Sequence, residues 1–68
     1  MVKPQSYRDV VKILTANGWV LLRQGKGSHE LWGLPDGSVY EAVYRGEVSA
    51  GVIRKLIVKL PKTPANWR

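Results

Sequence analysis

The apolar residues of this chain recur at helical spacing near both ends and form short strand-like runs between them. Ser6 precedes the first helical stripe and is placed to cap a helix, which Asn17-Gly18 is suited to end. Ser49 precedes the second stripe in the same way, and Pro61 stops it. The sequence therefore predicts one helix near each end of the chain. The stripes consist of Tyr7, Val10, Val11, Ile13 and Leu14 in the first helix and of Val52, Ile53, Leu56, Ile57 and Leu60 in the second.

Three strands are predicted between the helices, over residues 19–24, 29–34 and 38–44. The segments that separate them, 25–28 and 35–37, are short and rich in glycine and other turn-forming residues, which favours antiparallel hairpins. Residues 45–47 are predicted to be a loop. The order α-β-β-β-α gives the fold class α+β, a two-layer domain in which two helices cover one face of a three-stranded antiparallel sheet.

The length of the chain favours a single domain over residues 1–68, with a short basic, proline-containing tail at residues 61–68. A domain of this size buries only about 60% of the surface that its unfolded chain exposes. It contains no cysteine, which excludes a disulfide or a cysteine-based zinc site. No stretch approaches the roughly 20 apolar residues that cross a bilayer, and no signal peptide is evident at the start. We therefore expect a cytoplasmic protein that does not bind membranes.

The turn at residues 35–37 sets which side chains share a face of the sheet. A three-residue turn would pair Leu34 with Ser38 and place His29 opposite Val43. A shift of one residue in this register would exchange the two faces of a strand. The register predicts Trp32, Leu34, Tyr40 and Ala42 toward the helices, and His29, Leu31, Gly33, Val39, Glu41 and Val43 on the open face.

The charge of the chain points to a polyanionic partner. Eleven Lys and Arg residues stand against five Asp and Glu residues, for a net charge of +6. Such a surface attracts nucleic acid, although an acidic protein partner or a merely basic surface would also account for it. The candidate RNA contacts are Arg23, Lys26, Gly27 and Ser28 around the first turn and Arg54, Lys55 and Lys59 in the second helix.

His29 is the single imidazole of the chain and follows a glycine-rich basic turn. Histidine can take or give a proton at neutral pH, and metal-free RNA cleavage needs a base for the 2′-OH and an acid for the 5′-oxygen. One histidine can fill one role, and the other would fall to Lys26, Tyr44, another cation or water. The five carboxylates are scattered and offer no metal-ligand spacing, so neither a metal nor another cofactor is expected. From spacing alone, an ordinary surface histidine is the simpler interpretation.

Residues 18–29, which end in Gly27-Ser28-His29, resemble the HicA family of toxin ribonucleases. The family pattern is a short helix, Gly-aromatic, a strand, an Arg-Gln pair and then Gly-Ser-His. Residues 35–37 resemble its second turn, and residues 49–56 are similar to the start of its last helix. The resemblance implies a double-stranded-RNA-binding-like αβββα fold, mRNA cleavage by the histidine at position 29, and a HicB antitoxin as partner.

The chain departs from the family pattern in three places. Family members often carry a second histidine after the third strand, where this chain has Tyr44 or a neighbour. Ala50 replaces the usual proline at the last helix, and the tail with Trp67 matches no part of the pattern. These departures leave the main histidine in place.

We therefore expect the toxin of a type II toxin-antitoxin system, an mRNA endoribonuclease (mRNA interferase) that needs no metal and uses His29 as acid or base. The alternative is a non-catalytic RNA-binding module on the same fold, which would recognise RNA by shape, phosphates and 2′-OH groups. A third possibility is a protein-interaction domain with a basic face. His29 separates the first two, because a nuclease needs it and a binding module does not.

Overall fold

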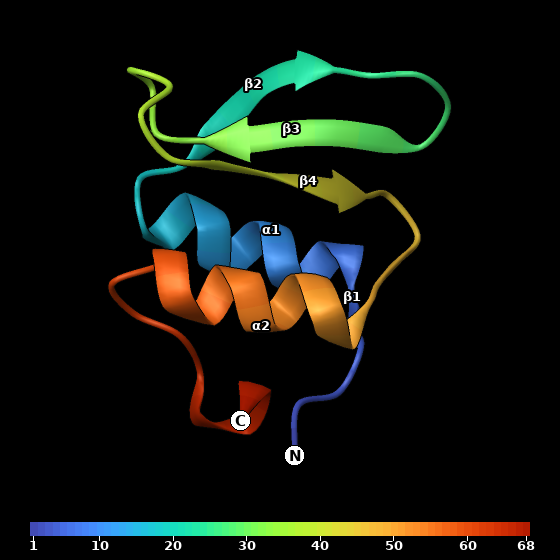
Figure 1. The fold of residues 1–68 in the computed structure, drawn as a ribbon, viewed down its shortest axis with the longest axis vertical. Helices are drawn as coiled ribbons and strands as arrows, with labels where there is room; N and C mark the ends of the chain where they lie inside the picture. The colour runs from blue at the N-terminus through green and yellow to red at the C-terminus, as the bar shows by residue number, and fades with distance from the viewer.

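The computed structural model describes residues 1–68 and has the predicted order of helices and strands. The three main strands form one antiparallel sheet in the order β2-β3-β4, and both helices lie on the same side of it (Figure 1). The predicted α+β, two-layer αβββα fold is confirmed. The main elements are α1 (Tyr7–Ala16), β2 (Val20–Gln24), β3 (His29–Gly33), β4 (Tyr40–Tyr44) and α2 (Ala50–Lys59).

The two helix starts are capped as predicted. The hydroxyl oxygen of Ser6 accepts a hydrogen bond from the Asp9 amide at 3.2 Å. That of Ser49 accepts one from the Val52 amide at 3.3 Å. Each cap satisfies a backbone donor that has no partner inside its helix. Gly18 follows the end of α1 with a φ of 81°, a conformation that favours glycine.

Two short strands escaped sequence analysis. Strand β1 (Gln5–Ser6) pairs antiparallel with β5 (Glu47–Val48), where a loop was predicted. The Tyr7 amide extends this pairing by donating to the carbonyl of Gly46 at 3.0 Å. The pair ties the start of α1 to the start of α2. No two-residue strand carries enough of an alternating pattern to be detected in a sequence.

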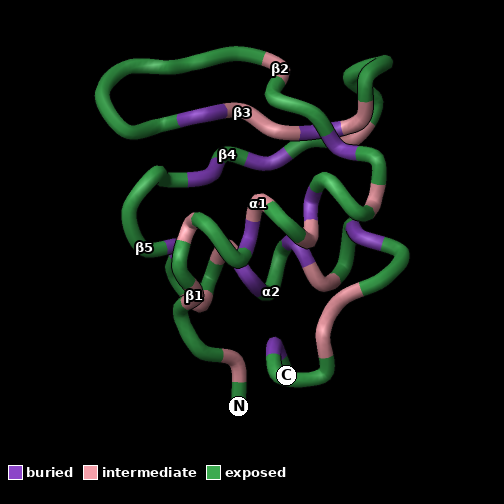
Figure 2. Tube along the Cα trace, turned by 180° about the vertical axis from the view of Figure 1, so that it is seen from behind, coloured by how far each residue is buried: buried purple, intermediate pink, exposed green.

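The core lies between the helices and the sheet. Val10 and Leu14 of α1, Val43 of β4 and Ile53 and Leu56 of α2 are all completely buried. Figure 2 shows buried stretches in both helices, in β3 and β4, and at the C-terminal end of the chain. The remaining buried apolar residues are Trp19, Val48, Leu60 and Trp67.

The hairpin between β3 and β4 is one residue longer than predicted. The Asp36 carboxylate accepts hydrogen bonds from the Ser38 amide at 2.9 Å and the Ser38 hydroxyl at 2.7 Å. The hydrogen bond from the Ser38 amide lowers the pKa of the Asp36 carboxyl, and the one from the Ser38 hydroxyl lowers it further. Ser38 thus belongs to the turn, and Leu34 pairs with Val39 by donating its amide to the Val39 carbonyl at 2.9 Å.

This extra residue corrects the predicted faces of β4. His29 lies opposite Tyr44 and Gly33 opposite Tyr40, so the predicted pairing of His29 with Val43 is wrong. Tyr40 and Ala42 were predicted toward the helices but are exposed on the open face. Val39, Glu41 and Val43 were predicted on the open face, but Val39 packs against the core and the other two are buried. The predictions for β3 hold, with Trp32 toward the core and His29 on the open face.

The tail returns along the helix layer on the side away from the sheet (Figure 1). The Asn17 side chain holds its start, since it donates to the Lys62 carbonyl at 2.9 Å and accepts from the Lys62 amide at 3.0 Å. A 3-10 turn, η1 (Ala65–Trp67), then places Trp67 against the helices with only 1% of its surface exposed. The tail is therefore part of the packed structure.

Candidate active site

His29 is the first residue of β3 and stands where the β2–β3 turn meets the sheet. The turn is closed by two backbone hydrogen bonds, from the Gly25 amide to the His29 carbonyl at 3.0 Å and from the His29 amide to the Lys26 carbonyl at 3.2 Å. Gly27 has a φ of 62°, which favours glycine at this position. The Gly-Ser-His segment thus has a local structural reason for its glycine, and it presents an exposed imidazole.

Tyr44 lies beside His29. The two residues are cross-strand partners, and their ring centroids are 4.1 Å apart at an interplanar angle of 44°. Tyr44 is 45% exposed, so its ring is accessible from the open face. The structure therefore brings a phenol, one of the groups considered for the second proton transfer, into contact with the imidazole.

A shallow hollow of about 160 Å³ opens next to His29. Arg23 lines it from β2, where it lies opposite Leu31, and Ala42 lines it from β4. Lys26, Gly27 and Ser28 stand in the adjoining turn and are all exposed. The structure thus places Arg23 and the predicted turn residues near His29. Of the predicted contacts, only Arg23 lines the hollow itself, together with Gly25, His29, Glu30, Leu31 and Ala42.

The other predicted RNA contacts lie elsewhere. Arg54, Lys55 and Lys59 belong to α2, which packs on the opposite side of the sheet from the His29 side chain. The Lys59 ammonium lies 2.7 Å from a carboxylate oxygen of the buried Glu41 and donates to the Tyr40 carbonyl at 2.8 Å. The Lys55 ammonium is 4.0 Å from the other oxygen of Glu41. The predicted contacts therefore form two separate groups, and Lys59 has a structural role as counter-ion.

Glu30 follows His29 in β3, and its buried carboxylate lies on the opposite face of the sheet from the imidazole. Glu30 is 5% exposed and turns toward the helices. Its Oε1 accepts hydrogen bonds from the Tyr7 hydroxyl at 2.7 Å and from the Trp32 indole at 2.9 Å. Burial raises the pKa of Tyr7, and the hydrogen bond to Glu30 raises it further. Arg45 supplies the counter-charge, with its Nε 3.9 Å from Glu30 Oε2.

Arg45 also holds the turn that carries His29. Its Nη2 donates to the Gly27 carbonyl at 3.3 Å, and its backbone amide donates to the Ser28 carbonyl at 3.0 Å. Sequence analysis missed this residue. A four-residue turn at 35–38 would have placed Arg45 opposite Ser28, so the signal was present in the hairpin length.

Neither metal-binding nor membrane-spanning features are found in the structure. No three His, Asp or Glu side chains gather where they could hold a metal ion together. Neither helix has the length and apolar character that crossing a membrane requires.

Comparison with known protein families gives one match. The family model described as the HicA toxin of bacterial toxin-antitoxin systems matches residues 7–60, well over half of the chain. Searches of curated proteins and of solved structures found no match. The matched residues run from the start of α1 to the end of α2 and include the whole His29 turn. The chain therefore belongs to the HicA family of bacterial toxin-antitoxin toxins.

Proposed function

We propose that this HicA toxin is an mRNA endoribonuclease that uses His29 as a catalytic acid or base and needs no metal. HicA toxins are mRNA interferases. The observation that carries the proposal is the position of His29, exposed at the end of a tight glycine turn, in contact with Tyr44 and beside the Arg23 hollow. The scattered carboxylates support metal independence, because Glu30 and Glu41 are already paired with cations.

The proposed reaction is attack of a ribose 2′-oxygen on the adjacent phosphorus. A base takes the 2′-OH proton as the new P–O bond forms, and an acid protonates the 5′-oxygen as the old P–O bond breaks. The products are a 2′,3′-cyclic phosphate and a free 5′-OH. His29 performs one transfer, and Tyr44 is the candidate for the other that lies in contact with it. Arg23 and Lys26 would stabilise the charge that develops on the phosphate.

We assign the remaining predicted contacts to RNA binding. Arg23, Lys26, Gly27 and Ser28 would hold the phosphates near the cleaved bond. Arg54, Lys55 and Lys59 lie on the other side of the sheet and would add long-range attraction to RNA. We further propose a HicB-type antitoxin as the protein partner and the cytoplasm as the location, since the substrate would be mRNA.

The test is cleavage of a mixed RNA by purified protein in the presence of EDTA, with analysis of the product ends. We expect cyclic phosphate ends, no cleavage of RNA whose 2′-OH groups are replaced by hydrogen, and a loss of about 10²–10⁴-fold in rate for His29→Ala. The matched control is Val58→Ala, an 85% exposed residue of α2, which should cleave at the wild-type rate.

Two results would contradict the proposal. One is a folded His29→Ala protein that cleaves as fast as the wild type. The other is a wild-type protein that binds RNA without cutting it, which would favour the non-catalytic RNA-binding module.

A further inference from the structure

The open face of the sheet carries exposed aromatic rings that the cleavage chemistry does not all require. Along β4, residues 40, 42 and 44 are exposed while 41 and 43 are buried. Tyr40 is 52% exposed and Tyr44 is 45% exposed. No helix or strand covers this face, because both helices lie on the other side (Figure 1). Two tyrosines thus stand on one uncovered surface.

Gly33 leaves the space that Tyr40 needs on this surface. Gly33 lies opposite Tyr40, and a Cβ at Gly33 would come within 2.8 Å of the Tyr40 Cβ and 2.9 Å of Leu22 Cδ1. The same Cβ would also clash with the Val39 carbonyl. The sheet therefore requires glycine at position 33, and the space above it is shared by Tyr40 and Leu22.

The two tyrosines mark the two ends of a path across the face. They are four residues apart on one strand, which corresponds to about 13 Å at about 3.3 Å per residue. Leu31 and Ala42 pair between them, and these two residues line the hollow beside His29. The path is therefore long enough to meet more than one base, and its Tyr44 end lies at His29.

The cations nearest the hollow come from β2 and the β2–β3 turn. Arg23 lines the hollow, and the exposed Lys26 stands in the adjoining turn. Glu30 also lines the hollow, but it is 5% exposed and its carboxylate is paired with Arg45 on the helix side, where Glu41 is buried with Lys59. A phosphate backbone that crosses the open face would therefore meet cations and no strand carboxylate.

We propose that the open face binds single-stranded RNA, with one base stacked on the ring of Tyr40 and another in the hollow beside His29. This inference rests on the proposed function and defines its substrate as unpaired RNA. In a duplex the faces of the bases are covered by their neighbours, so an exposed tyrosine ring can stack only on an unpaired base. The base at Tyr40 would fix the strand so that a phosphate lies at His29.

The test measures binding, independently of cleavage. The probe is a fluorescent 2′-O-methyl oligoribonucleotide, which lacks the 2′-OH and cannot be cut, compared with an abasic strand of equal length and with its own duplex. We expect Tyr40→Ala to weaken binding of the base-bearing single strand by about 5- to 100-fold and to leave abasic binding unchanged. Tyr40→Phe keeps the ring and should bind like the wild type, and Val58→Ala serves as the surface control.

Equal binding of the base-bearing strand by Tyr40→Ala and the wild type would overturn the inference and leave this face to a protein partner. Wild-type protein that binds the duplex as tightly as the single strand would overturn it too. Because the probe cannot be cleaved, either result can occur while His29→Ala still abolishes cleavage, so failure here is distinct from failure of the proposed nuclease activity.

Discussion

The buried carboxylate of Glu30 lies on the helix side of the sheet and interacts with residues that support the candidate site. A charged group that is 5% exposed is tolerated only when it is paired and hydrogen-bonded. Tyr7 and Trp32 supply the hydrogen bonds, and Arg45 supplies the charge. The same counter-ion also bonds to the turn before His29. The carboxylate therefore links helix α1 to the position of the imidazole.

Replacing Tyr7 with Phe removes one hydrogen bond to Glu30 and leaves the ring in place. We expect a loss of about 1–3 kcal/mol in the free energy of unfolding at neutral pH, because a buried acceptor loses its partner. Denaturant unfolding followed by circular dichroism measures this loss. An unchanged free energy of unfolding would show that Trp32 and Arg45 suffice for Glu30.

The same variant changes the alkaline limb of the stability curve. The folded-state pKa of Tyr7 is raised above the ordinary 10.0, so the stabilisation is fully present below pH 10.0 and is lost as pH rises through the folded-state pKa. The wild type should therefore lose stability at high pH more steeply than Tyr7→Phe.

At this scale only part of the candidate site was predicted from the sequence. His29, Arg23 and Lys26 were predicted as site residues, because their chemistry or their place beside a glycine turn is local information, and Tyr44 was one of several groups considered for the second proton transfer. Glu30 and Arg45 were not, since their roles depend on which residues face each other across the hairpin.

At the scale of elements, helix ends were predictable and strand faces were not. An N-cap is a hydrogen bond between residues three positions apart, so Ser6 and Ser49 could be predicted as caps from local sequence alone. The face of β4 depends on one residue of turn length, and Asp36 settles it by recruiting Ser38 into the turn. Because side chains alternate, that one residue exchanged every predicted position of β4.

Arg45 provides the prediction that belongs to the hairpin as a unit. Arg45→Lys keeps the positive charge but loses the guanidinium that reaches Glu30 and the Gly27 carbonyl together. We expect cleavage to slow by up to about 100-fold through misplacement of His29, while the salt dependence of RNA binding is kept. Hydrogen exchange of the His29 backbone amide, which donates to the Lys26 carbonyl, should become faster. If Arg45→Lys exchanges its His29 amide and cleaves RNA at the wild-type rates, Arg45 does not position His29.

At the scale of the whole molecule, the tail adds a third level to the two expected layers. The family match ends at residue 60, and residues 61–68 follow it across the outer side of the helices. The terminal amine donates to the Arg68 carbonyl at 3.2 Å, so both chain ends meet there. We propose that residues 1–68 fold as one domain that includes this tail. The tail's packing could not be predicted, because a lone tryptophan that follows two prolines carries no periodicity.

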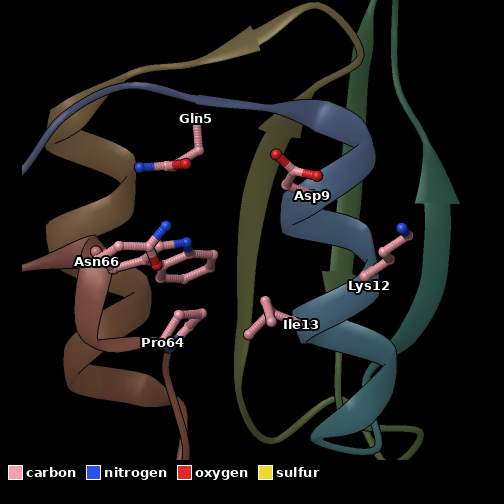
Figure 3. A pocket seen from close by; sticks show the side chains of 7 residues that line it. Gln5, Asp9, Lys12, Ile13, Pro64 and Asn66 are labelled. Carbon is pink, nitrogen blue, oxygen red and sulfur yellow. The ribbon is translucent and has the colours of Figure 1, made fainter.

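Trp67 tests whether the tail is needed for folding. Trp67 is 1% exposed and borders a hollow of about 310 Å³ between the tail and α1. Figure 3 shows Asp9 and Ile13 of α1 facing Pro64 and Asn66 of the tail, with Gln5 at one end of the hollow. Trp67→Ala leaves a large cavity and should cost about 3–5 kcal/mol. Domains are stable by only about 5–15 kcal/mol, so much of the protein could then be unfolded at physiological temperature.

The neighbouring Asn66 supplies the matched control. It lies in the same 3-10 turn but is exposed, so Asn66→Ala should change the free energy of unfolding by no more than about 0.5 kcal/mol. Thermal unfolding of the two variants beside the wild type gives the comparison. If Trp67→Ala melts with the wild type, the tail is an appendage and the HicA unit of residues 7–60 carries the stability alone. If only Trp67→Ala melts at a lower temperature, the stability of the toxin depends on a segment outside the family match. Deletion of residues 61–68 should then abolish cleavage, because the domain would unfold although it keeps every residue of the candidate site.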